Sequence, residues 1–125
     1  MKIDVVEVVK KKFGDKCSGE IYNYLKDLVL KKPDDKLIDE LMLIKKLFSN
    51  RIRVLILILL SQAALPVCAL TSILNVDQTL VSHNLSVLKK LGITREERVG
   101  KYRVYSLNKK KLKRILQTAI STILA

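Results

Sequence analysis

The sequence predicts a mainly α-helical fold with one small β-hairpin, and three observations lead to this prediction. Apolar residues recur at helical spacing along most of the 125 residues. The spacing changes to strand-like alternation only after Gly92, on either side of Gly100. Apolar residues make up 49% of the chain and charged residues 29%, which is typical of a globular protein with a core of its own.

The N-terminal part of the chain predicts two helices and shows no recognisable chemistry. One helix is expected over residues 2–13, and a second from Ser18 to just before Pro33, because a residue preceding proline leaves helical geometry. The apolar stripe of the first helix consists of Ile3, Val6, Val9 and Phe13. The buried side of the second is expected to consist of Ile21, Tyr22, Leu25, Leu28 and Val29. We therefore expect residues 1–32 to form a helical extension and residues 33–125 to form the main domain.

Two more helices are predicted between Asp34 and Gln62. Asp34 and Asp35 favour a helix N-terminus, because the helix dipole stabilises acidic side chains there. The apolar face that follows consists of Leu37, Leu41, Ile44 and Leu47 or Phe48. After Ser49 and Asn50, residues 51–62 are apolar on nearly every side, as expected of a central helix packed all round.

Residues 64–92 have the pattern of a helix, a tight turn and a longer helix. A turn at residues 64–66 precedes a short helix over residues 67–74, and residues 75–77 form the second turn. Asp77 is expected to cap the long helix and Gly92 to end it in a left-handed turn. This pattern indicates a helix-turn-helix.

The long helix, residues 77–91, has two different faces. Its apolar stripe contains Val81, Leu85 and Leu88, flanked by Leu80 and Leu91. Its polar face consists of Gln78, Thr79, Ser82, His83, Ser86, Lys89 and Lys90. Short hydrogen-bonding side chains on the first turns of a helix can reach base edges in a DNA major groove. We interpret this helix as a recognition helix.

The alternating stretch after Gly92 predicts two short strands that meet at residues 99–101. The flanks of this hairpin carry the basic residues Arg95, Arg98, Lys101 and Arg103. Such a hairpin can lie along a phosphate backbone as a wing, over residues 95–103, which makes the predicted fold a winged helix-turn-helix.

A final helix is predicted after Asn108, which can cap it. Lys109, Lys110 and Lys111 occupy its first turn, where the helix dipole disfavours cations. Phosphate contact would explain them, and good solvation of these side chains is the alternative. Its apolar positions are Leu112, Ile115, Leu116, Ala119, Ile120, Ile123 and Leu124. So wide an apolar face needs a partner surface, either the N-terminal helices or a second subunit.

The charge of the chain limits the classes of partner. The net charge is +12, and nine Lys or Arg against two Glu in residues 93–125 give this quarter of the chain a net charge of +7. A polyanionic partner, most simply nucleic acid, is expected. The apolar run Ile52–Leu60 is too short to span a bilayer, and residues 1–13 do not resemble a signal peptide. We therefore expect a cytoplasmic protein that does not bind membranes.

No constellation of catalytic residues is present in the sequence. It contains a single histidine, no glycine-rich phosphate loop and no paired carboxylates on an apolar stretch. We therefore expect neither an enzyme nor a bound cofactor.

From Phe48 to Asn108 the sequence resembles the ArsR family of winged helix-turn-helix repressors. The segments that carry the resemblance are NRIRVLILILL, VCALTSILNVDQTLVSHNLSVLKKLGI and REERVGKYRVYSLN. It implies a homodimer that places one recognition helix per subunit in successive major grooves and regulates transcription at a near-palindromic site. It also implies that the helices before Phe48 and after Asn108 form the dimer interface.

Together, the residues and the resemblance predict two sets of functional residues. The set expected to contact DNA is Gln78, Thr79, Ser82, His83, Ser86, Lys89, Arg95, Arg98, Lys101, Arg103, Lys109 and Lys110. The set expected at the dimer interface is Leu41, Ile44, Leu112, Ile115, Leu116, Ala119, Ile120 and Ile123.

The chain departs from the metal-sensing members of the family. Where a Cys-x-Cys pair is common, it has Pro66-Val67-Cys68, and residues 109–125 contain no Asp, Glu, His or Cys. Because a soft metal needs three or four thiolate or imidazole ligands, no metal site is expected. We expect Cys17 and Cys68 to be small buried hydrophobes, and a redox pair between them is the alternative.

Two other functions fit the same features. A non-specific chromatin-type or RNA-binding protein, or a protein-interaction module with a winged fold, would also suit the basic charge. A sequence-specific regulator differs from them by preferring its site over random duplex by ~10³ or more.

Overall fold

The structure, a computed structural model, describes residues 2–16 and 19–124. Contacts divide the chain into a unit that ends at Ile38 and a unit that begins at Asp39. Helix α3 (Asp35–Leu47) begins in the first unit and continues in the second. The predicted division into residues 1–32 and 33–125 stays a prediction.

The N-terminal unit contains a two-stranded antiparallel sheet as well as helices. Strands β1 (Lys2–Asp4) and β2 (Val29–Lys31) pair, with Asp4 opposite Val29. Between them lie α1 (Val5–Phe13), the 3-10 turn η1 (Gly14–Lys16) and α2 (Gly19–Leu25). The predictions of helix over Lys2–Asp4 and beyond Leu25 are therefore wrong. Residues 2–4 and 29–31 instead form strands that pair with each other.

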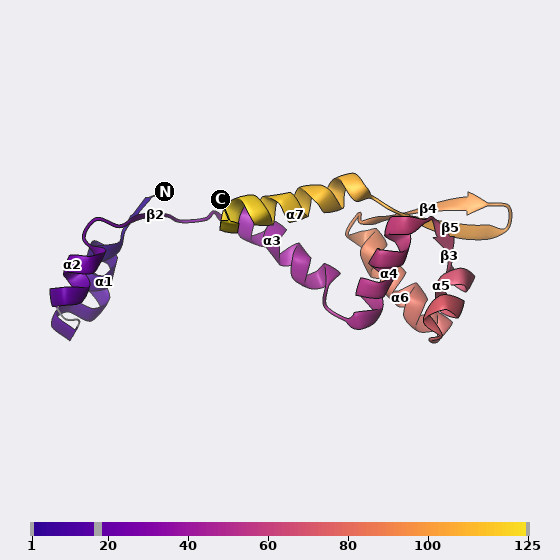
Figure 1. The fold of residues 1–125 in the computed structure, drawn as a ribbon, viewed down its shortest axis with the longest axis horizontal. Coiled ribbons are helices and arrows are strands. Elements are labelled where there is room, and N and C mark those ends of the chain that lie inside the picture. Colours follow the sequence, from indigo (N-terminus) through magenta and orange to yellow (C-terminus); the bar gives the residue numbers. More distant parts are fainter. Residues whose placement is uncertain (1, 17–18, 125) are drawn as a thin grey trace. The chain divides into compact units, whose positions relative to one another are not determined.

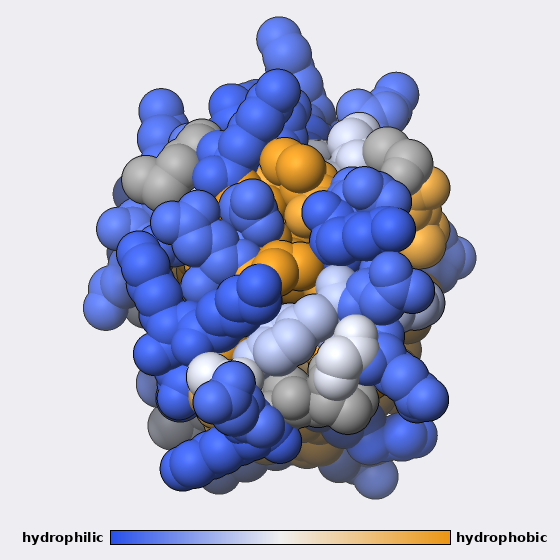
Figure 2. All heavy atoms as spheres, turned by 90° about the vertical axis from the view of Figure 1, so that its left-hand side faces the viewer, coloured by the Kyte–Doolittle hydropathy of each residue, from blue (hydrophilic) through white to orange (hydrophobic). Residues whose placement is uncertain are grey.

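Apolar side chains of the N-terminal unit remain accessible to solvent. Phe13 is 45% exposed, and the predicted buried residues Ile21, Leu28 and Val29 are 47%, 39% and 60% exposed. None of the residues described between 2 and 38 is buried. So short a segment has too little volume to enclose its own apolar residues. Hydrophilic side chains dominate the surface shown in Figure 2, with small apolar patches between them.

The second unit has the predicted mainly helical fold with a small sheet (Figure 1). After α3 come α4 (Arg51–Gln62), β3 (Leu65–Pro66), α5 (Val67–Leu74), α6 (Gln78–Lys90), β4 (Thr94–Val99), β5 (Tyr102–Leu107) and α7 (Lys109–Leu124). The strand order is β3-β5-β4, all antiparallel. Residues 64–66 are therefore more than the predicted turn, because Leu65 pairs with Tyr105 and Pro66 with Val104. Proline is tolerated in β3 because this is an edge strand.

One hydrophobic core holds the second unit together. Its buried apolar side chains are Leu47, Ile56, Leu57, Leu60, Leu70, Val81, Leu85, Leu88, Ile93 and Ile115. They come from α3, α4, α5, α6 and α7 and from the start of the hairpin. Since Val81, Leu85 and Leu88 are 0% exposed, the predicted apolar stripe of α6 is confirmed, whereas Leu80 is 42% exposed and does not belong to it.

Helix α4 differs from the prediction that it is packed on all sides. Ile58 is 52% exposed, whereas the charged residue Arg53 is only 7% exposed. α4 has 12 residues, and no helix in the described part of the chain is long and apolar enough to cross a membrane.

Side-chain caps set the helix ends as predicted. The Asp77 carboxylate accepts a hydrogen bond from the Thr79 N–H at 3.0 Å, and the Asn108 amide oxygen accepts one from the Lys111 N–H at 3.2 Å. Gly92 ends α6 with a φ of 74°. Asn75, also left-handed at φ 51°, ends α5, so a three-residue turn separates α5 from α6.

Candidate nucleic-acid interface

The polar face of α6 is directed away from the core. Its predicted base-contacting side chains, Gln78, Thr79, Ser82, His83 and Ser86, are all exposed. No carboxylate belongs to this face, and burial of the opposite stripe fixes which side chains point outward. Figure 1 shows α5 and α6 beside one another, with the β4–β5 hairpin next to them.

The β4–β5 hairpin places basic side chains beside α6. Arg98 is paired with Arg103, Lys101 lies in the connecting turn, and all three are exposed. Because side chains alternate along a strand, Glu96, Arg98, Arg103 and Tyr105 share one face of the hairpin. A cavity of about 440 Å³ lies between this face and α6, lined in part by Gln78, Ser82, Lys89 and Arg103.

An acidic residue lies in the middle of this basic surface. The Glu96 carboxylate is 2.5 Å from Lys89 Nζ and 3.2 Å from Arg103 Nε. The hydrogen bond from Lys89 lowers the pKa of Glu96, and the charges of Lys89 and Arg103 add to the effect. Glu96 is therefore not a solvated surface residue, since its side chain is only 17% exposed and joins the hairpin to α6.

The two wing tyrosines have different environments. Tyr105 packs against the core, and this burial raises the pKa of its hydroxyl, with a smaller contribution from the charge of Glu96. Tyr102 is 55% exposed. Tyr105 is therefore the ring that packs beneath the wing.

A buried polar network holds α6 against α4, and the sequence did not lead us to expect it. The Asn84 side-chain oxygen accepts hydrogen bonds from Arg53 Nε at 3.1 Å and from Asn50 Nδ2 at 3.2 Å. The Asn84 amide nitrogen donates to the Leu80 carbonyl at 2.9 Å. Asn84 is 2% exposed and lies three residues after Val81, on the apolar stripe of α6. A polar residue at a buried position needs hydrogen-bond partners, so its place on this stripe could have indicated the network from sequence.

The same network reaches the end of α3. Arg53 Nη1 donates to the Lys46 carbonyl at 2.5 Å and to Ser49 Oγ at 2.8 Å. The Arg53 N–H also donates to the Asn50 side chain, which caps α4, at 2.8 Å. In the part of the chain that the structure describes, the guanidinium donates to neutral oxygens, and these bonds tie the end of α3, the start of α4 and the middle of α6 together.

The structure separates the predicted interface residues into three groups. Leu41, Ile44, Leu112, Leu116 and Ala119 are half-buried, whereas Ile120 and Ile123 are exposed. Ile115 is 1% exposed and packs in the core of the same chain, so its prediction as an interface residue is wrong. An ion pair at 4.0 Å between Glu40 and Arg114 connects α3 with α7.

The remaining predicted residues are all accessible. Arg95, Lys109 and Lys110 are exposed, and Lys89 is exposed apart from its contact with Glu96. Cys68 is exposed, so the expectation that it is buried is wrong. Its predicted redox partner, Cys17, lies outside the described residues. Within residues 2–16 and 19–124, no three His, Cys, Asp or Glu side chains gather at one place.

Comparisons with known proteins place this chain among bacterial regulators. The family model described as "Bacterial regulatory protein, arsR family" matches residues 50–95. The HTH-type transcriptional regulator NmtR of Mycobacterium tuberculosis is 38% identical over 68 residues, which are 54% of this chain and 57% of that protein. The matched segment therefore spans less than two thirds of that relative.

Solved structures of such regulators match a larger share of the chain. The solution structure of apo-NmtR is 30% identical, covers 73% of this chain and 76% of its own, and gives a TM-score of 0.55. The second structure is a homodimeric winged helix-turn-helix DNA-binding domain of a possible ArsR-family regulator from Mycobacterium bovis. It is 24% identical, the match covers 74% of this chain and 90% of that one, and the TM-score is 0.57. With its helix-turn-helix, its wing and these matches, the chain belongs to the ArsR family of bacterial regulatory proteins.

Proposed function

We propose that this chain binds duplex DNA sequence-specifically as a homodimer and represses transcription by occupying its site. The observation that carries the proposal is the exposed, carboxylate-free polar face of α6, held in place by a buried opposite stripe and placed beside a basic wing. The names of its relatives support it, because NmtR is a transcriptional regulator and the mycobacterial domain is a homodimeric DNA-binding domain.

The proposal divides the contacts into base reading and backbone binding. Gln78, Thr79, Ser82, His83 and Ser86 are the side chains that read bases in the major groove. The residues that contact phosphates are Lys89, Arg95, Arg98, Lys101, Arg103, Lys109 and Lys110. These cations supply the salt-dependent part of the affinity, and the polar side chains supply the preference for one sequence.

Apolar side chains on α3 and α7 support the homodimer. Met42 is 49%, Ile120 57%, Ile123 72% and Leu124 77% exposed. Apolar residues concentrated at the end of a terminal helix favour burial against a second copy. The two recognition helices of the dimer would then lie about 34–36 Å apart, one turn of DNA.

Selection of bound duplexes from a random library tests the proposal. The expected result is an inverted repeat whose half-sites are centred about 10 base pairs apart. Recovery of featureless sequences would instead identify a general nucleic-acid binder, as the net charge of +12 would also allow. The selection is run with reduced protein and repeated after oxidation, because loss of the site on oxidation would identify a thiol-responsive regulator.

A further inference from the structure

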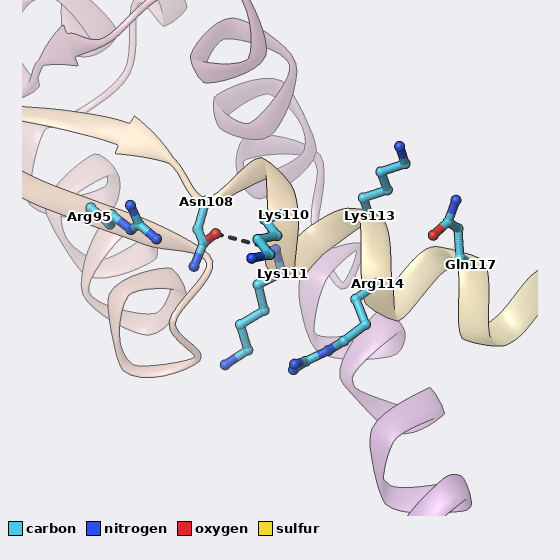
Figure 3. A pocket seen from close by; sticks show the side chains of 7 residues that line it. All are labelled: Arg95, Asn108, Lys110, Lys111, Lys113, Arg114 and Gln117. Atoms are coloured by element: carbon cyan, nitrogen blue, oxygen red, sulfur yellow. Dashed lines mark hydrogen bonds between the residues drawn. The ribbon is translucent and has the colours of Figure 1, made fainter.

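A second basic site lies at the base of the hairpin, where β4 faces the first turns of α7. A cavity of about 570 Å³ is lined there by five cationic side chains, Arg95, Lys110, Lys111, Lys113 and Arg114, and by two amide side chains. Among the described residues, none that lines it is acidic. Lys111 and Arg114 extend to the same side of α7, across from the strand that carries Arg95 (Figure 3).

The cations of this cavity are poorly neutralised by the protein. Lys111 Nζ donates to the Leu91 carbonyl at 2.6 Å, and Arg114 reaches Glu40 only at 4.0 Å. In the part of the chain that the structure describes, Arg95, Lys110 and Lys113 make no ion pair at all. Like charges that share one cavity repel one another, so binding of an anion there removes an unfavourable interaction.

This cavity lies apart from the recognition helix, although Arg95 and Lys110, which line it, are also among the proposed phosphate contacts. Arg95 and Glu96 are neighbours on β4, and alternation places them on opposite faces of the hairpin. Arg98 and Arg103 lie on the face that contains Glu96, next to α6. Arg95 is also four residues from the end of β4 at Val99, roughly 13 Å along the strand from the wing tip.

We propose that this cavity binds a small anion that carries several phosphate groups. Its volume lies within the range of roughly 300–1,000 Å³ that is usual for small-molecule sites. The planar guanidinium groups of Arg95 and Arg114 suit bidentate contacts with phosphate oxygens, and the lysines add point charges. Five cations match a ligand with several negative charges better than a single phosphate.

Titration of the purified protein with inorganic tripolyphosphate tests this site, by calorimetry at fixed ionic strength. The cavity variant is Arg95→Gln with Lys110→Gln. The matched control is Arg98→Gln with Lys109→Gln, which changes the same elements and the same net charge outside the cavity. All four side chains are exposed, so the variants should fold, and unfolding midpoints confirm this.

We expect wild type and control to bind one tripolyphosphate per chain and the cavity variant to bind about tenfold or more weakly. The single variant Lys113→Gln should weaken binding as well. Equal weakening in the cavity and control variants would mean attraction by net charge only and would overturn the proposal. So would absence of saturable binding to the wild-type protein.

A second arm separates a free anion from the phosphates of DNA. If the cavity serves only the DNA backbone, tripolyphosphate will bind the cavity and control variants equally, without the selective loss expected for a small-anion site. Both variants will still lose duplex affinity, because Arg95 and Lys110 are also among the proposed phosphate contacts. That result would overturn the assignment of a small ligand. The titration contains no DNA, so its outcome does not depend on the proposed function.

Discussion

At the scale of single residues, Glu96 has the largest consequence for the proposed DNA surface. It is an acid placed between Lys89 and Arg103, two of the cations assigned to phosphate contacts. While these ion pairs exist, the Glu96 carboxylate neutralises part of the positive charge of Lys89 and Arg103, so less of it is available to attract DNA phosphates. Glu96 also joins α6 to the wing, so it favours one arrangement of the surface while weakening its attraction for phosphate.

We predict that Glu96→Gln binds duplex DNA about threefold to tenfold more tightly than wild type at low salt, with a steeper salt dependence. The substitution frees Lys89 and Arg103 for phosphate and removes one negative charge. Glu97→Gln is the control, because it removes the same charge from an exposed neighbour. Equal gains in both variants, measured by fluorescence anisotropy over a salt series, would show that only net charge matters.

Gln78 and Lys101 test the division between base reading and phosphate binding. Lys101→Ala should weaken binding to all duplexes alike and reduce the salt slope by about 1 per subunit. Gln78→Ala should change which sequence is preferred, at a cost of about 1–3 kcal/mol for the wild-type site. Both are measured by competition between the selected site and random duplex. A uniform loss of affinity in both variants would remove Gln78 from the base-reading set.

At the scale of elements, the sequence was sufficient wherever the signals are local. The predicted bounds of α4 and α5, residues 51–62 and 67–74, agree with the structure, because helical spacing and neighbouring caps determine them. The strands at residues 29–31 and 65–66 were missed, because each exists only by pairing with a distant segment. No local pattern reveals such a partner.

In the candidate site, too, the features that depend on local sequence were predicted, and those that depend on packing between elements were not. Exposure of the polar face of α6 follows from its period, and the expected residues are accessible. The ion pairs of Glu96 and the bond between Arg53 and Asn84 depend on how separate elements pack. Arg53 lies within an apolar run, and only its burial against α6 shows that it has a structural role.

The network around Asn84 makes a prediction about the position of α6. Asn84→Ala leaves Arg53 Nε without its acceptor in a buried place, and we expect a loss of about 1–3 kcal/mol in the free energy of unfolding. Ser86→Ala, an exposed change on the same helix, should cost less than about 0.5 kcal/mol. Urea denaturation measures both. If the two losses are equal, the network does not hold α6 against α4.

At the scale of the whole molecule, the proposed homodimer depends on the end of α7. Ile123→Glu puts a charge into an apolar face that is 72% exposed in the single chain, and we expect dimerisation to weaken about a hundredfold or more. Ile73→Glu is the control, because it puts the same charge on an apolar residue that is also exposed, at 56%, but that belongs to α5 and not to α7. Sedimentation velocity distinguishes the species. A dimer that persists in the Ile123 variant would place the interface elsewhere.

The N-terminal unit, which has no buried residue in its described part, has a consequence for hydrogen exchange. A backbone hydrogen bond is protected from exchange only to the extent that opening it exposes buried apolar surface or breaks neighbouring contacts. Amide protons of α1, α2 and β2 should therefore exchange at close to the rates of an unstructured peptide. Amide protons of α4 and α6, which surround the core of the second unit, should be the slowest in the chain. Slow exchange in α1 or α2 would mean that another surface covers this unit in solution.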